Sequence, residues 1–350
     1  MTRRMPLSIM VLSGVAAALF LISVPASGQG GKTGKNWSAP HTADGHPDFS
    51  GLWTNVTITP FERPRDLAAK EYFTEQEAAD YEKLSVQQRN RDRRERGTNR
   101  DVASAYNDFW WDSGTKVVKT RRTSIVVDPP DGRVPPLTAE RQKELAARVE
   151  ATKRRCEQPG CEPENSGLLG PADGPEDRPL MERCLHFGGA GPPMLPGAYN
   201  NNYQVVQGPG FVAIDVEMAH DVRRIPLDGR PHAPSNVRQW MGDSRGHWEG
   251  DALVVETTNF TNKTRFRGSD ENLKLVERFT LADPDTIIYR FTVDDPTAYT
   301  KPWTGEIPMV RTEGPLFEYA CNEGNSGMAG ILSSARSDEK KAAEAAKKLK

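Results

Sequence analysis

The second half of the chain is a series of short apolar runs separated by turn residues, and this feature limits the possible folds more than any other. The runs are rich in Val, Ile, Phe and Tyr, and they end at turn signals such as Gly208-Pro209 and Asp228-Gly229. Short runs at close spacing are typical of an antiparallel sandwich or barrel. The expected strands are 203–207, 211–217, 222–227, 252–258, 273–281, 286–293, 305–311 and 316–319.

Side chains alternate in character along the later runs. Ile287, Tyr289 and Phe291 share one face of their run, and Arg290 lies on the other. One face of each strand therefore packs in a core, while the other meets solvent or a polar cavity. Glu277 interrupts the apolar face of the preceding run. A charge there is costly unless it is paired, so Glu277 is either a rim residue or part of a site.

Helices are expected ahead of the strand series. Thr74 and Glu77 form a Thr-x-x-Glu capping box, which predicts a helix over 75–94. Thr138 is the expected N-cap of a second helix over 140–154. We therefore expect one β-rich domain with a helical insertion and flexible ends. The expected boundaries are a flexible leader over 29–47, the domain over 48–335, the insertion over about 66–155 and a charged tail over 336–350.

The N-terminus has the pattern of a secretory signal peptide. Two arginines precede an apolar run over 6–24, and cleavage is expected after Ala26 or Gly28. An uncleaved membrane anchor is the alternative, because the run is near the ~18-residue lower limit for a spanning helix. We expect residues 1–28 to be a signal peptide. The mature protein is then periplasmic or secreted, with no membrane insertion.

An even number of cysteines in an exported protein favours disulfides. Cys156 and Cys161 flank a Pro-Gly turn signal and are expected to close a tight loop, and Cys184 is then expected to pair with Cys321. A zinc site is the alternative, but the spacing of the first pair departs from C-x2-C and no His is adjacent. We therefore assign no metal and no cofactor.

The charge balance limits the partners. The chain has 46 Lys and Arg against 48 Asp and Glu, a formal net charge of -2. Nucleic acids and anionic membranes need a basic surface, so neither is expected as a partner. A small-molecule ligand or substrate is therefore the expected partner.

Three stretches resemble a family of exported, uncharacterised bacterial proteins. They are His46-Pro-Asp-Phe-Ser-Gly-Leu-Trp53, Tyr199-Asn-Asn-Asn-Tyr-Gln-Val-Val-Gln207 and Gly242-Asp-Ser-Arg-Gly-His-Trp-Glu-Gly-Asp251. The resemblance covers most of residues 40–335 and implies no particular activity.

Part of the chain is also similar to lipocalins. Gly51-x-Trp53 resembles the Gly-x-Trp that opens lipocalins, and residues 246–296 look like lipocalin-like barrel repeats. The resemblance implies an antiparallel lipocalin-like barrel or curved sheet. It also implies that Trp53 is buried, with Arg290 or Arg311 packed on its ring. The helical insertion departs from a plain lipocalin and leaves the strand order open.

Glu217, His220 and Asp221 are the candidate catalytic residues. A His beside a carboxylate is the commonest acid–base device, and the following Arg223 and Arg224 are suited to an anionic group. The alternative is that His220 caps a turn and Glu217 pairs with one of the arginines. We expect Glu217, His220 and Arg224 to converge on one cavity.

A second set of residues is assigned to ligand binding. The Asn202 amide either lines a polar site or stabilises a turn, and Trp248 packs either on a ligand or in the core. His247 and Glu249 share one face of a strand, where they either hold a proton or metal or form a surface pair. The ligand-binding set is Asn202, Arg224, Trp248 and Glu249.

Three classes of function fit these assignments. The first is an exported lipocalin-like protein that binds a small molecule in a barrel cavity. The second is a periplasmic hydrolase or lyase in which His220 acts as acid–base with Glu217 or Asp221. A structural envelope protein is the third. A dry apolar interior favours binding, whereas a His with two carboxylates inside the cavity favours catalysis.

Overall fold

The structure is a computed structural model that describes residues 37–67, 69–90, 92, 97, 108–164 and 168–349. The expected signal peptide over 1–28 lies outside these residues, as does the first part of the expected leader. The described residues belong to one compact unit. Within the described ranges, no helix has both the length and the apolar character needed to cross a membrane.

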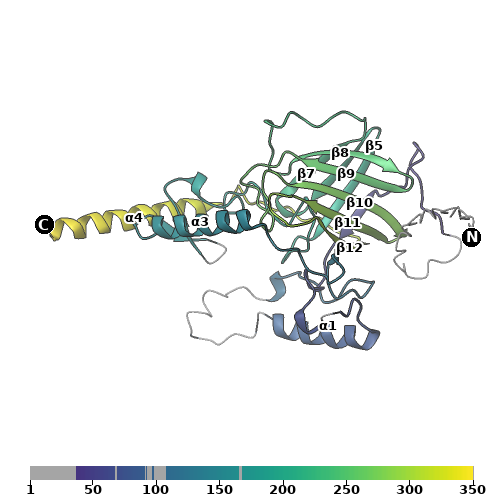
Figure 1. Ribbon diagram of the computed structural model, residues 1–350, viewed down its shortest axis with the longest axis horizontal. Coiled ribbons are helices and arrows are strands. Elements are labelled where there is room, and N and C mark those ends of the chain that lie inside the picture. Colours follow the sequence, from purple (N-terminus) through teal and green to yellow (C-terminus); the bar gives the residue numbers. More distant parts are fainter. Residues whose placement is uncertain are drawn as a thin grey trace, which may run out of the picture. The chain divides into compact units, whose positions relative to one another are not determined.

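The protein is mainly β, as the sequence predicts, with an antiparallel sheet that is nearly closed into a barrel (Figure 1). The strands of the sheet are β1 (Gly51–Thr54), β2 (Val126–Asp128), β5 (Asn202–Gly208), β6 (Phe211–Val216), β7 (Asp221–Pro226), β8 (Asp243–Glu249), β9 (Ala252–Thr258), β10 (Lys274–Asp283), β11 (Thr286–Asp294) and β12 (Trp303–Arg311). Their order is β7-β6-β5-β1-β12-β11-β10-β9-β8, and β2 pairs with β12.

Two meanders make up this sheet. Strands β5 to β7 follow one another through short turns. Strands β8 to β12 also follow one another, through tight turns after β8 and β10 and through longer loops over 259–273 and 295–302. Gly210 and Gly250 lie in two of these turns with φ of 74° and 58°, a conformation that glycine adopts without strain. The short strand β1 joins the meanders, because it pairs with β5 on one side and with β12 on the other.

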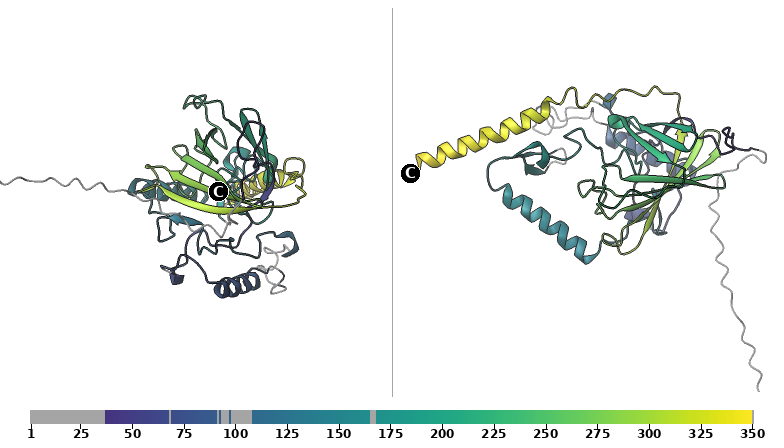
Figure 2. Two further views of the ribbon diagram at one scale, coloured as in Figure 1. Left: turned by 90° about the vertical axis from the view of Figure 1, so that its right-hand side faces the viewer. Right: turned by 90° about the horizontal axis from the view of Figure 1, so that it is seen from above.

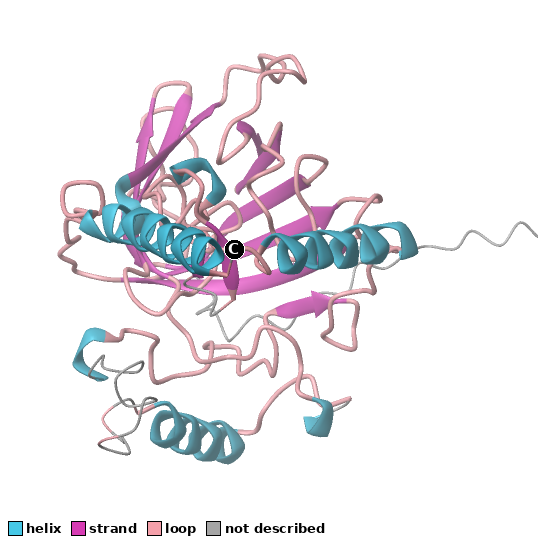
Figure 3. Ribbon diagram, turned by 90° about the vertical axis from the view of Figure 1, so that its left-hand side faces the viewer, coloured by secondary structure: helices cyan, strands magenta, loops and turns pink. Residues whose placement is uncertain are grey.

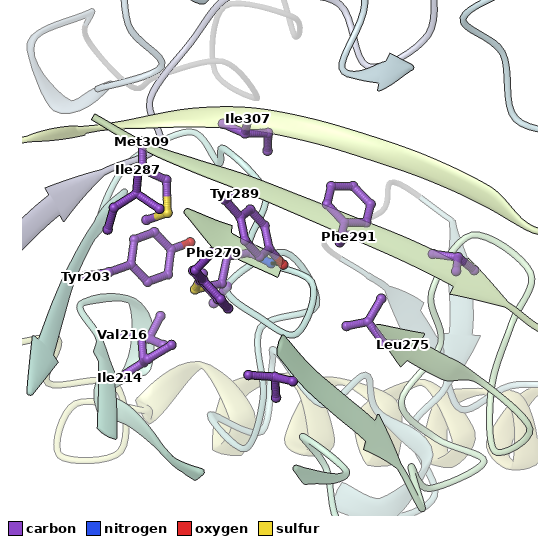
Figure 4. Packing of buried hydrophobic residues seen from close by; sticks show 14 of the residues in the cluster. Tyr203, Ile214, Val216, Leu275, Phe279, Ile287, Tyr289, Phe291, Ile307 and Met309 are labelled. Carbon is purple, nitrogen blue, oxygen red and sulfur yellow. Dashed lines mark hydrogen bonds between the residues drawn. The ribbon is translucent and has the colours of Figure 1, made fainter. Parts of the chain in front are cut away.

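The core fills the inner face of the sheet. Alternate residues of β10, β11 and β12 point inward, in agreement with the pattern of the sequence, and meet side chains from β5 and β6 (Figure 4). The residues labelled there are Tyr203, Ile214, Val216, Leu275, Phe279, Ile287, Tyr289, Phe291, Ile307 and Met309. Large side chains therefore occupy this part of the barrel interior.

The predicted environment of Trp53 is confirmed. Its side chain is fully buried, and its indole N–H donates to the Phe49 carbonyl at 2.8 Å. The guanidinium of Arg311 lies 4.2 Å from the ring centroid, because the register of β1 and β12 places these two residues opposite each other. The other candidate, Arg290, binds Glu306 instead.

The helices lie outside the sheet (Figure 3). Helix α1 (Glu75–Arg89) has the predicted capping box at Thr74 but ends before residue 94, with Asn90 as its C-cap. Helix α3 (Ala139–Arg155) begins at the predicted N-cap, Thr138. The short 3-10 helices are η1 (Arg65–Leu67), η2 (Asp108–Trp110), η3 (Pro175–Asp177) and η4 (Met218–His220).

The expected tail is part of a longer helix, α4 (Ser326–Lys348). The Asn325 side chain accepts the Met328 N–H and so caps the N-terminus of α4. Ala335 is buried, and Arg336 donates to the carbonyls of Ala172 and Asp173. A small hairpin of β3 (Cys161–Pro163) and β4 (Leu169–Pro171) contacts both α4 and α3 (Figure 2). The Asn325 cap places the start of the helix before residue 336.

Two further segments differ from the sequence prediction. The described part of the expected leader contains a turn, in which the Thr42 N–H donates to the His46 carbonyl at 2.8 Å. Residues 316–319 are not a strand. The N–H groups of Phe317 and Tyr319 meet side chains of Glu217 and His220 rather than a neighbouring strand.

Both predicted disulfides are present. Cys156 and Cys161 close a short loop after α3, with their Cα atoms 5.4 Å apart. Cys184 and Cys321, which lie 137 residues apart in the sequence, join two irregular segments with a Cα separation of 5.7 Å.

Candidate functional site

The barrel has a seam between its edge strands, β7 and β8. The path from β7 to β8 contains an odd number of strands, each antiparallel to the next, so the two edges run in the same direction. They approach each other without being neighbours in the hydrogen-bonded order of the described strands (Figure 1). Side chains, and not ladder hydrogen bonds, therefore hold this seam.

One end of the seam is tightly packed. A Cβ placed on Gly246 of β8 would lie 2.6 Å from Leu227 Cδ2 and 2.8 Å from Ile225 Cγ2. Only the absence of a side chain at residue 246 allows so close an approach. Nearer the starts of β7 and β8, Arg223 Nη2 lies 3.3 Å from Ser244 Oγ.

The other end of the seam opens into a cleft of about 280 Å³. Its walls come from the start of β7, from the residues that lead into β8, and from the loop that contains Leu185. The lining residues are Leu185, Asp221, Val222, Arg223, Arg224, Gln239, Trp240, Met241, Gly242, Asp243 and Ser244. The cleft therefore combines charged groups with an indole and a thioether.

A buried polar network lies beneath the cleft. Arg223 and Glu277 have side-chain exposures of 2% and 0%, and they form two parallel hydrogen bonds of 3.0 and 2.6 Å. Tyr289 donates its hydroxyl to Glu277 at 2.8 Å and accepts the Met194 N–H at 3.0 Å. The charge that interrupts the apolar face of β10 is thus paired, as its cost requires.

Two members of this network, Tyr289 and Arg223, have raised pKa values. Burial raises the pKa of Tyr289 well above its usual value, and the Glu277 carboxylate adds to the effect. Burial acts to lower the pKa of Arg223, but Glu277 outweighs it and the pKa is raised. Both groups therefore stay protonated and donate to Glu277. The Arg223 Nε has no hydrogen-bond partner among the described residues.

A second ionisable pair includes Asp221 of the cleft lining. The Oδ2 atom of Asp221 lies 3.7 Å from Nδ1 of His186, whose side chain is 5% exposed. Neither atom has a hydrogen-bond partner within the described residues. The Cys184–Cys321 disulfide anchors the loop that carries His186.

The structure divides the predicted catalytic set. Glu217 is buried, and its carboxylate accepts the N–H groups of Asn202 at 3.2 Å and Phe317 at 3.1 Å. His220 is exposed, with a ring nitrogen 3.1 Å from the Tyr319 N–H. Both side chains hold the segment before Cys321, and neither belongs to the lining of the cleft. The expected convergence of Glu217, His220 and Arg224 on this cavity is therefore not found.

Asp221 and Arg224 do line the cleft, but the inward arginine is Arg223. The register of β6 and β7 pairs Arg223 with Ile214, a core residue, so Arg224 falls on the outer face. Its guanidinium lies 5.6 Å from the centroid of the Phe211 ring. A shift of one residue along a strand reverses the face.

The remaining predicted ligand-binding residues lie elsewhere. Trp248 lines a separate pocket of about 190 Å³, and its ring stacks on His46 with a centroid distance of 4.5 Å. Glu249 forms surface ion pairs with Arg278 at 2.6 Å and with His247 at 3.2 Å. Asn202 contributes its backbone N–H to Glu217.

No metal centre is assembled by these groups. Within the described ranges, the His, Cys, Asp and Glu side chains do not gather in a set of three or more that would hold a metal ion.

His186 was missed from the sequence, and the inward orientation of Arg223 was not predicted. Arg223 shares the face of Ile225, so the alternation of β7 contained the signal that it points inward. His186 lies in an irregular, Pro- and Gly-rich segment where no periodicity exists. Its only sequence signal is its position two residues after Cys184.

Comparisons with known proteins do not assign the chain to a family. A scan against models of protein families finds no match. A search of curated proteins finds no significant match.

Proposed function

We propose that the protein binds a small molecule in the cleft between β7 and β8. The observation that supports this proposal most directly is the cleft itself, which combines polar groups with apolar surface. Such a combination is typical of ligand sites. The nearby part of the barrel interior is occupied by large side chains (Figure 4), so the proposed site differs from the central cavity of a lipocalin.

The size of the cleft limits the ligand. Pockets for drug-sized ligands have volumes of about 300–1,000 Å³. At about 280 Å³, this cleft suits a smaller molecule. Trp240 and Met241 offer apolar contacts, while Asp221 and Gln239 offer hydrogen-bonding groups.

We also propose that the protein works in the periplasm or outside the cell and is related to lipocalins. Two disulfides support the first statement, since thiols are kept reduced in the cytosol. The predicted signal peptide agrees with it. The contact between Arg311 and Trp53 supports the second.

The hydrolase or lyase alternative has less support. One possible partner of its acid–base residue, Asp221, lines the cleft and lies 3.7 Å from His186. The acid–base residue itself, His220, and its other possible partner, Glu217, are engaged with backbone N–H groups of the segment before Cys321. A catalytic group must be within reach of a substrate proton, and neither residue lines the cleft.

Blocking the mouth of the cleft tests the proposed function. Val222 lines the cleft and is 57% exposed, whereas Val206 on β5 is 46% exposed and lies outside the lining. We expect Val222→Trp to weaken the binding of small polar fragments by about tenfold or more, measured by saturation-transfer NMR with a fragment library.

The matched variant Val206→Trp should bind the same fragments as well as the unchanged protein does. Equal binding by the Val222→Trp protein and the unchanged protein would place the ligand site elsewhere.

A further inference from the structure

The charges around the cleft differ in how completely they are neutralised. Asp243 lines the cleft, but its carboxylate is surrounded by donors. It lies 2.6 Å from an Arg245 nitrogen and 3.0 Å from His232 Nδ1, and it accepts the Ala233 N–H at 2.9 Å. This carboxylate has little capacity left for a ligand.

The two arginines of the lining differ in their surroundings. Arg223 is neutralised by Glu277 through two short hydrogen bonds in the core. Arg224 points to the outer face, where its guanidinium packs over Phe211. Arg223 therefore leaves no uncompensated positive charge on the floor of the cleft, and the charge of Arg224 lies at the outer face of β7.

Asp221 is different. Its side chain is 23% exposed, and among the described residues its ionic contact is with His186 at 3.7 Å. An imidazole balances a carboxylate only when it is protonated, and the separation exceeds that of a hydrogen bond. The buried Oδ2 atom of Asp221 has no hydrogen-bond partner in the described part of the chain. The cleft therefore presents one carboxylate whose charge is incompletely balanced.

An aromatic side chain completes the arrangement. Trp240 lines the same cleft and is half-buried, beside the thioether of Met241. A carboxylate together with an indole is a chemical combination that recognises organic ammonium ions, because the ring face attracts a cation and the carboxylate balances its charge. An anionic ligand would instead meet the Asp221 carboxylate.

We infer that the ligand of the seam cleft is a small organic ammonium compound, held by Asp221 and Trp240. This inference rests on the proposed function, since it names the chemical class of the molecule that the cleft binds. A compact cation also agrees with the small volume of the cleft.

Calorimetric titration with choline tests the inference. The comparison compound is the uncharged isostere of choline, in which a tert-butyl group replaces the trimethylammonium group. We expect choline to bind at least about tenfold more tightly than this isostere. We expect Asp221→Asn to remove most of that difference and Trp240→Leu to weaken choline binding several-fold.

Asp215→Asn is the matched control, because Asp215 lies on β6 and outside the lining of the cleft. It should leave choline binding unchanged. Melting temperatures identify any variant that fails to fold, and the isostere comparison on the unchanged protein does not depend on the variants.

Two results would overturn the inference. The first is equal binding of choline and its isostere. The second is no binding of choline while other fragments bind in a manner that Val222→Trp blocks. In the second case the cleft remains a ligand site and only the ammonium class is wrong. If no fragment binds at the cleft, the proposed function itself fails.

Discussion

Replacing Glu277 with Gln is expected to lower the free energy of unfolding by about 3–5 kcal/mol. The change leaves the Arg223 guanidinium buried in the core without its counter-charge. It also weakens the hydrogen bond from Tyr289. Breaking a buried ion pair costs more than removing both partners, because one charge stays desolvated.

Urea denaturation of two further variants separates this effect from a general loss of packing. The double variant Arg223→Met, Glu277→Leu removes both charges, and we expect it to recover most of the lost stability. Glu249→Gln alters an exposed surface pair with Arg278 and should leave the free energy of unfolding nearly unchanged. A cost below about 1 kcal/mol for Glu277→Gln would show that the pair is not buried as described.

Removing the long-range disulfide is expected to have the second large effect. Cys184→Ser with Cys321→Ser should lower the free energy of unfolding by about 2–5 kcal/mol, because the bridge closes a loop over a separation of 137 residues. The bridge also fixes the loop with His186 and the segment bound by Glu217. Ligand affinity of the cleft should therefore fall as well.

The short bridge provides the matched control. Cys156 and Cys161 are only 5 residues apart, so their replacement by Ser restrains the unfolded chain far less. We expect this pair to cost clearly less in denaturation experiments and to leave the cleft unaffected. A larger loss from the short bridge than from the long one would contradict this account of the two disulfides.

Local patterns in the sequence were sufficient for much of the fold. Alternation identified the inner face of β11, and Thr74 and Thr138 marked the starts of two helices. The Gly51-x-Trp53 resemblance led to the contact between Trp53 and Arg311. Each of these signals depends on neighbouring residues, or on a motif whose environment is known.

The site was harder to predict because it depends on which segments meet at the edges of the barrel sheet. Glu217 and His220 have the spacing of a catalytic pair, yet the structure uses them to hold residues 317 and 319. That segment lies about a hundred residues further along the chain, and no local pattern links the two. The partnership of Arg223 with Glu277 likewise needs the closure of the sheet.

The seam itself also lies beyond sequence reasoning. Whether β7 and β8 meet depends on where β1 inserts between the two meanders, and β1 is only 4 residues long. Because the path from β7 to β8 contains an odd number of strands, these two edge strands run in the same direction and cannot close the barrel as an antiparallel pair. A cleft forms where the two edges separate, and its lining follows from the tertiary arrangement.

The most direct test of the central claim is a crystal structure of the mature protein soaked with a mixture of small amines and neutral polar fragments. We predict electron density for a bound molecule between β7 and β8, in contact with Trp240 and Asp221. Density only beside Trp248, or inside the barrel among the core side chains, would contradict the assignment of the seam cleft as the binding site.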